Sequence, residues 1–209
     1  MNVQGIDVSN WQGAFSWAPW KGRIGFGMAR ATEGDGQTDP DLKHNWDSMW
    51  FMQPDHRFVR AAYHFFHAAQ DPVVQAAHFT ATVKGHGLLP GDLLVADFEA
   101  TDPATGLNDG VPPAVFAGRA VTFLHQVSAM APGHKVLAYM DPSFAHAGHS
   151  AGMGCWDLWI ADYGISEPAV PAPWQHWTFW QSTDSPVDGD RYNGDVGQLL
   201  AYSGMPARR

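Results

Sequence analysis

Short apolar segments that each end in polar or glycine residues recur along the whole chain and constrain its fold more than any other feature. Helical patterns separate several of these segments, and strands that alternate with helices are typical of parallel βα units. Asp71 followed by Pro72 is a usual helix start, because it places a capping side chain before a proline at the first helical position. We expect strands at 3–9, 24–31, 57–66, 92–99, 135–140, 157–163 and 176–182, and helices at 41–52, 72–84 and 112–130.

The last third of the chain departs from this alternation. After Tyr139 there is one short helical stretch, and the tryptophan-rich strands that follow are joined by loops too short for full helices. No internal repeat, low-complexity linker or change of composition divides the 209 residues. The sequence therefore predicts one α/β domain over residues 1–209, a βα barrel that is irregular in its last third.

Composition narrows the classes of function. The formal net charge is -9 and no Lys/Arg cluster interrupts the acidity, so nucleic acid and anionic membrane surfaces are unexpected partners. No apolar stretch approaches the ~20 residues of a membrane span, and the N-terminus lacks the cationic and apolar parts of a signal peptide. We therefore expect synthesis in a cytoplasm and no insertion into a membrane.

Cys155 is the single cysteine, which excludes an internal disulfide, and we expect it to be a small buried apolar residue.

The segment "LLVADFEA" (93–100) ends a continuous apolar run on two acids, Asp97 and Glu99. In a parallel barrel the strands are buried on both faces and the active site lies at their carboxyl ends. Side chains alternate along a strand, so these two acids share one face, about 6.6 Å apart at the backbone. Repulsion raises one pKa, which favours a proton donor beside an anion, as in a glycosidase. Other predicted strands also carry polar or aromatic groups near their ends: Asp7, Glu33, Tyr63 with His64, Tyr139, and Asp162 with Tyr163.

Several other interpretations are weaker. The D-x-E pattern is common and also fits a solvated loop start. His64 and His67 invite a metal site, but a spacing of three on a strand points them to opposite faces, and no HExxH or paired-cysteine pattern exists. We expect no metal and no cofactor. The absence of G-x-S-x-G and P-loop motifs gives no support to a serine hydrolase or a nucleotide-binding protein. Four tryptophans are expected to pack in the core or at the rim rather than to stack on sugars: Trp11, Trp159, Trp177 and Trp180.

Six ordered motifs resemble those of the family 25 glycoside hydrolases, the lysozymes (N-acetylmuramidases) of bacteria, fungi and phages. The resemblance covers residues 5 to about 195 and implies a modified TIM-like βα barrel with about five βα units followed by extra strands. The motifs are "GIDVSNWQG", "RATEG", "YHFF", "ADFE", "LWIADYG" and "FWQST…VDGDRYNG".

The resemblance also implies roles for individual residues. Glu99 matches the general acid that protonates the glycosidic oxygen, and Asp97 matches the second carboxylate, which stabilises the reacting sugar. The chain departs from the family where "WQSTDSP" lacks a tyrosine and where Asp190 replaces a common asparagine. Glu33 matches a supporting acid, and it could instead pair with Arg30 or Arg60. The other substrate-binding candidates are Asp7, Asp188, Tyr63, Tyr139 and Tyr163.

The predicted activity is hydrolysis of the β-1,4 bond between N-acetylmuramic acid and N-acetylglucosamine in peptidoglycan, by a monomer. Without a signal peptide, a phage endolysin that stays in the host cytoplasm until release fits this expectation. Three alternatives remain open at this point: a chitinase-like barrel glycosidase, a non-catalytic wall-binding module on the same barrel, and a zinc amidase or peptidase.

Overall fold

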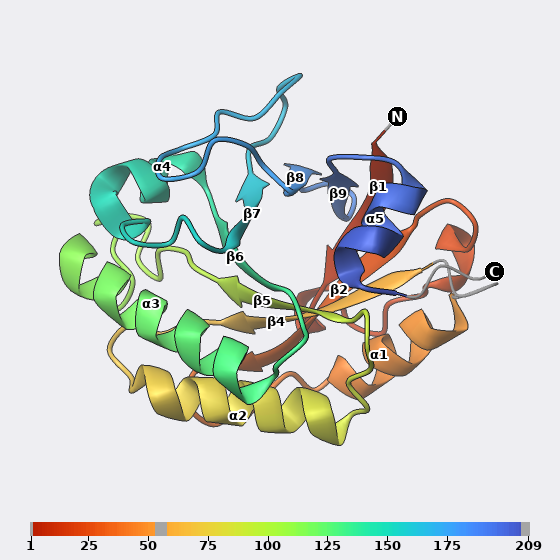
Figure 1. Ribbon diagram of the computed structural model, residues 1–209, viewed down its shortest axis with the longest axis horizontal. Helices are drawn as coiled ribbons and strands as arrows, with labels where there is room; N and C mark the ends of the chain where they lie inside the picture. Colours follow the sequence, from red (N-terminus) through yellow and green to blue (C-terminus); the bar gives the residue numbers. More distant parts are fainter. Residues whose placement is uncertain (1, 53–57, 206–209) are drawn as a thin grey trace.

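The computed structural model describes residues 2–52 and 58–205, and its strands form a closed barrel (Figure 1). Parallel pairing runs from β1 through β2, β4, β5, β6 and β7 to β8. The last strand, β9, closes the barrel because it pairs antiparallel with both β8 and β1. The barrel strands are β1 (Val3–Val8), β2 (Phe26–Glu33), β4 (Val59–Phe65), β5 (Leu93–Asp97), β6 (Val136–Met140), β7 (Asp157–Ala161), β8 (Phe179–Thr183) and β9 (Asp188–Tyr192).

Helices follow several of the parallel strands and cover the barrel on one side, where α2 and α3 pack together (Figure 1). A two-residue strand, β3 (Gln37–Thr38), pairs with the end of β2. In residues 2–52 and 58–205 no helix combines the length and apolar character needed to cross a bilayer. The helices are α1 (Leu42–Phe51), α2 (Pro72–Gly85), α3 (Pro113–Met130), the short α4 (Pro142–Phe144) with a π-helical turn (Ala145–His149), and α5 (Val196–Ser203).

The predicted barrel with an irregular last third is confirmed. Each predicted strand and helix is present with shifts of a few residues at its ends, although Arg57, at the start of one predicted strand, lies outside the described residues. The predicted start of α2 is also confirmed, since the Asp71 carboxylate accepts a hydrogen bond from the backbone of Val73 at 2.8 Å. The extent of a single domain over all 209 residues stays a prediction.

The strand β9 and the helix α5 were not predicted. The β9 sequence, "DGDRY", is polar and contains a glycine, so its residues have low strand propensity. It forms a strand because β1 and β8 pair with it on both sides. The signal for α5 was present in the sequence: Asp195 and Gln198 form a capping box, and Gly204 ends the helix with a left-handed conformation.

The barrel interior is apolar near the amino ends of its parallel strands. Inward-facing side chains from successive strands pack there, and α5 closes this end by placing Leu199 among them. A second apolar cluster fills the space between the outer face of the strands and the helices. Because side chains alternate across a strand, residues two positions further along face the same interior. The carboxyl ends of the strands therefore carry the inward-facing residues that can form a site.

Candidate active site

A pocket of about 350 Å³ opens at the carboxyl ends of the barrel strands. A second hollow of about 360 Å³ adjoins it and shares Glu99, Tyr139 and Tyr163 with it. Glu99 thus lies between two concave surfaces. The first pocket is lined by Asp7, Ser9, Trp11, Gln12, Arg30, Tyr63, Phe65, Asp97, Glu99, Tyr139, Trp159, Tyr163, Gln181 and Asp188.

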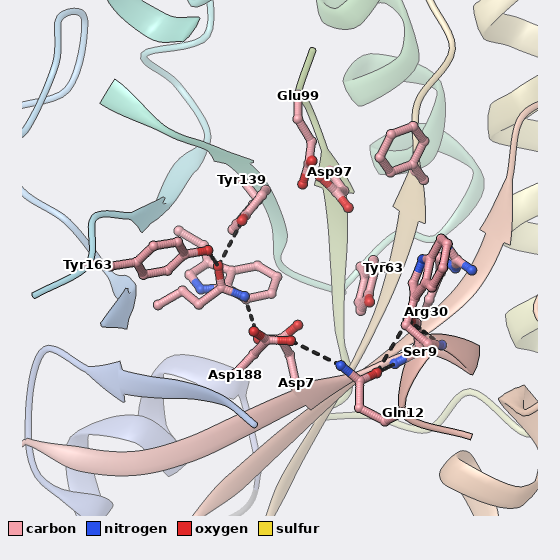
Figure 2. A pocket seen from close by; sticks show the side chains of 14 residues that line it. Asp7, Ser9, Gln12, Arg30, Tyr63, Asp97, Glu99, Tyr139, Tyr163 and Asp188 are labelled. Atoms are coloured by element: carbon pink, nitrogen blue, oxygen red, sulfur yellow. Dashed lines mark hydrogen bonds between the residues drawn. The ribbon is translucent and has the colours of Figure 1, made fainter. Parts of the chain in front are cut away.

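Asp97 and Glu99 enter this pocket from the end of β5, with their carboxyl groups close together (Figure 2). Asp97 is the last residue of the strand and is 6% exposed. Phe98, between them, points to the outer face, where it packs against Phe66 and Phe116. Burial of this one aromatic ring therefore directs both neighbouring acids to the inner face, as the alternation of the strand predicted.

The backbone after β5 is also held in place. The fully buried Asn108 donates from Nδ2 to the carbonyl oxygens of Phe66 and Glu99, at 2.8 Å each. Its Oδ1 accepts from the backbone N–H of Ala68. One amide side chain therefore ties the segment that carries Glu99 to the segment that follows β4. The sequence offered no sign of this role, because Asn108 lies nine residues beyond the motif in an irregular loop.

Burial raises the pKa of both acids of this pair. For Asp97 the rise is large, and the charge of Glu99 adds to it. For Glu99 burial is also the main cause, partly offset by a hydrogen bond with Asp97. Among the described residues, Oδ1 of Asp97 has no hydrogen-bond partner. Together the two carboxyl groups retain a proton at pH values where exposed acids have lost theirs.

A hydrogen-bonded network on the opposite wall holds Asp7. Its Oδ2 accepts from Nε2 of Gln181 at 2.7 Å. Oε1 of Gln181 in turn accepts from the hydroxyl groups of Tyr139, at 2.8 Å, and Tyr163, at 2.5 Å. Asp188 is opposite Asp7 in the β1–β9 register, and its Oδ2 accepts from Nε2 of Gln12 at 3.2 Å (Figure 2). Burial, then the charge of Asp188, raises the pKa of Asp7 to about 7.

Gln181 and Gln12 were not among the predicted site residues. Both stand inside the quoted motifs, Gln12 in "GIDVSNWQG" and Gln181 in "FWQST", so their positions were visible. Their neutral amides did not suggest acid–base chemistry. The structure shows that each one donates a hydrogen bond to an acid of the pocket.

Glu33 lies outside the pocket lining. Its carboxylate pairs with Arg30 at 3.3 Å and with Nε2 of His67 at 3.2 Å. Of the two predicted salt-bridge partners the structure shows Arg30, because Arg60 is paired with Asp92. Arg30 lines the pocket, so Glu33 reaches the site through that side chain.

The tryptophan predictions were wrong at one position of four. Trp11 is 84% exposed and lines the pocket, because it lies in a short 3-10 helix (Asn10–Gln12) beyond the end of β1. The other three are buried, as expected for packing residues, although Trp159 also reaches the pocket: Trp159, Trp177 and Trp180.

The prediction of a buried cysteine was also wrong. Cys155 is exposed, in the turn that precedes β7. A turn at the surface gives its side chain no apolar layer to enter.

The two histidines do not converge. His64 is fully buried on β4, where it contacts Thr32 at 2.8 Å and Gln75 at 3.1 Å, and burial lowers its pKa to about 3. His67 lies beyond the strand and contacts Asp109 and Glu33. Across the part of the chain that the structure describes, no group of three or more His, Cys, Asp or Glu side chains is arranged to hold a metal ion.

Comparisons with known proteins agree with the barrel and with the ordered motifs. Lysozyme M1 from Streptomyces globisporus is 29% identical over 222 residues, covering 98% of this chain and 72% of that protein. The lysozyme structure from Streptomyces coelicolor is 28% identical with a TM-score of 0.84 and covers 99% of both chains. The family 25 lysozyme structure from Aspergillus fumigatus, at 23% identity, shares the fold with a TM-score of 0.84, covering 98% of this chain and 100% of that one. Since the model of the family described as "Glycosyl hydrolases family 25" also matches residues 6–190, the chain belongs to that family.

Proposed function

We propose that this protein is a lysozyme that hydrolyses the β-1,4 bond between N-acetylmuramic acid and N-acetylglucosamine in bacterial peptidoglycan. The observation that carries the proposal is the pair Asp97 and Glu99, two adjacent carboxyl groups with raised pKa values that face an open pocket. A glycosidase needs one carboxylic acid and one carboxylate at the reacting bond. The lysozyme relatives favour peptidoglycan as the substrate.

Glu99 is assigned the role of general acid. Its position between two hollows suits a group that protonates the oxygen joining two sugars, one in each hollow. Glu99 is also the more accessible acid of the pair, on a segment just beyond the strand. In the free enzyme the larger rise in pKa belongs to Asp97. In the proposed reaction the shared proton passes to Glu99 when the acetamido N–H of the substrate donates a hydrogen bond to Asp97.

The second step uses the substrate itself. As Glu99 transfers its proton to the leaving oxygen, the 2-acetamido oxygen attacks the anomeric carbon and forms a cyclic intermediate. Asp97, now anionic, orients the acetamide and balances its positive charge. Water then opens the ring and gives its proton back to Glu99, so the configuration at the anomeric carbon is retained.

The remaining residues of the pocket are assigned to contacts with the sugar and to the balance of charge in the pocket. The pocket-lining acids Asp7 and Asp188 face the reacting sugar, and the exposed ring of Trp11 offers an apolar face on which a sugar can stack. Glu33 acts indirectly, by fixing Arg30. The aromatic residues assigned to sugar contact are Tyr63, Tyr139 and Tyr163. A monomeric state, independence from metals and a phage endolysin source stay predictions.

Digestion of purified peptidoglycan tests the proposal. New reducing sugar ends on muramic acid are expected, without new free amino groups. New amino groups would instead indicate an amidase or peptidase. Sedimentation with the wall without any new ends would indicate a binding module, and cleavage of chitin at a comparable rate would indicate a chitinase-like enzyme. Each of these three outcomes would overturn the muramidase assignment.

A further inference from the structure

A further carboxyl group, Asp190, lies beneath Asp7 in the barrel interior. It is 1% exposed and is not among the residues that line the pocket. In the sheet it stands opposite Gly5 of β1 and Gln181 of β8. Since Asp7 is two residues after Gly5, the side chains of Asp7 and Asp190 lie on the same inner face. The carboxyl groups are within hydrogen-bonding reach of each other.

Within the described residues, one side chain donates to Asp190 and no cation pairs with it. The indole Nε1 of Trp159 donates to its Oδ1 at 2.9 Å. Its Oδ2 is buried, and no donor within the described ranges reaches it. Arg191, the next residue, lies over the ring of Trp180, and the guanidinium group of Arg30 is paired with Asp39 and Glu33.

Two adjacent carboxylates without a cation are unstable in such an environment. A buried charge that has no partner is costly, and a like charge beside it adds to the cost. One proton between the two groups removes the repulsion and satisfies the free oxygen. Asp7 is the better anion of the two, because it accepts from Gln181 and faces the open pocket.

We propose that Asp190 is held as a neutral carboxylic acid whose Oδ2–H donates a hydrogen bond to Asp7, so that it acts as a positioning residue for that acid. Oδ1 then remains the acceptor for Trp159, and both oxygens of Asp190 are satisfied. Burial, followed by the charge and hydrogen bond of Asp7, raises the pKa of Asp190 well above its ordinary value. The effect on catalysis rests on the proposed function, whereas the protonation state does not.

The titratable groups that act on Asp190 are Asp7 from β1 and Asp188 from its own strand. The strands β7 and β8 contribute Trp159 and Gln181, which do not titrate. The ring of Tyr63 lies beside that of Trp159, and its phenol stays protonated, because burial and then the charge of Asp7 raise its pKa well above its ordinary value. Burial is therefore the main cause of the raised pKa of Asp190, and Asp7 is the charged group that acts on it most strongly.

Asparagine at this position is the matched test, since it keeps the shape, the acceptor for Trp159 and a donor toward Asp7 but cannot ionise. Leucine is the contrasting variant, because it removes the donor. Near neutral pH, where Asp7 can ionise, we expect D190N to retain kcat within about threefold of wild type, and D190L to lose about tenfold with KM little changed. The alkaline limb of the pH profile should move to higher pH in D190N. A D190N variant as impaired as D190L at every pH would overturn the proposal.

Two readouts do not depend on wall lysis. Wild-type protein should show infrared carbonyl absorption from buried carboxylic acids near neutral pH, to which the pair Asp97 and Glu99 also contributes, and D190N should lack the part of that absorption that comes from Asp190. In the unfolded chain Asp190 ionises near its ordinary pKa of 3.8, so its contribution to stability is lost as pH rises from that value through the raised pKa of the folded state. The melting temperature of D190N should therefore exceed that of wild type by a margin that widens with pH.

These readouts distinguish the protonation of Asp190 from the proposed lysozyme function. They also remain informative if the leucine variant fails to fold. A carbonyl band identical in wild type and D190N, or a constant difference in melting temperature, would mean that Asp190 is ionised and would overturn the inference. If wild type produced no reducing ends but showed the band and the widening margin, the proposed function would fail and the protonation of Asp190 would stand.

Discussion

The two ends of the barrel interior are built on the same strands but carry opposite chemistry. At the amino ends, inward positions are apolar and fully packed, for example Phe26, Leu93 and Phe179, and α5 covers them. At the carboxyl ends, the inward positions include Asp7 and Asp97 and are open to the pocket. One end buries apolar area, which stabilises the fold. The other end buries acids with raised pKa values, which lowers the stability at neutral pH but supplies the chemistry.

The largest expected effect on activity is that of Glu99→Gln, a substitution at the carboxyl end of the barrel. The amide cannot donate the proton, so the ~10²–10⁴-fold contribution of general acid catalysis should be lost. The shape is nearly preserved, so the variant should fold, and its melting temperature should not fall, because an acid with a raised pKa has been removed. Release of reducing ends from peptidoglycan measures the loss, and Glu167→Gln, at an exposed position, is the matched control. A folded variant that kept more than about a tenth of wild-type lysis would exclude Glu99 as the acid.

The second prediction concerns Asp97→Asn, which should lower kcat by about 10²-fold or more, because the amide cannot balance the positive charge of the intermediate. A wall substrate whose muramic acid lacks the acetyl group should be cleaved at a comparably reduced rate. Asp47→Asn, at an exposed position of α1, provides the control.

Proton NMR of the first-formed product distinguishes the two routes that a pair of carboxyl groups allows. Retention gives the β-anomer first, as the substrate-assisted route requires. If the α-anomer appeared first, Asp97 would instead be the base that activates water.

Substitutions at the amino ends of the strands, which α5 covers, should change the stability of the protein rather than its catalysis. Phe179 is fully buried and its ring packs against Phe26 at 5.0 Å and Tyr192 at 5.2 Å between centroids. Phe179→Ala should therefore lower the free energy of unfolding by about 3–5 kcal/mol, while kcat per folded molecule stays within about twofold, since the site lies at the other end. Denaturant unfolding measures this, with exposed Phe51→Ala as the control. A proportional loss of kcat in the folded fraction would show that the two ends are coupled.

The smallest expected effect is that of metal removal. Dialysis against EDTA should leave wall lysis unchanged, because Asp7 and Asp188 accept hydrogen bonds from amide groups and the described residues include no metal-binding cluster. A loss of activity that zinc alone restores would contradict the carboxylate mechanism.

Sequence alone determined the barrel and the pair Asp97 and Glu99. Apolar runs, helix caps and the alternation of side chains are local properties, so they can be identified without knowing the neighbours. Every predicted helix was identified from such local signals, and the capping box at Asp195 was a sufficient signal to predict α5 as well.

Only the tertiary structure decided which side chains complete the site. Gln181 and Gln12 became relevant because β8 and the segment after β1 bring them to Asp7 and Asp188. The exposure of Trp11 does not follow from residue type, and only the structure selects Arg30 over Arg60 as the partner of Glu33. The strand β9 exists because two neighbours pair with it, and its position buries Asp190 beside Asp7. Burial and long-range contact set the charge and direction of these groups, and both are properties of the assembled barrel rather than of any segment.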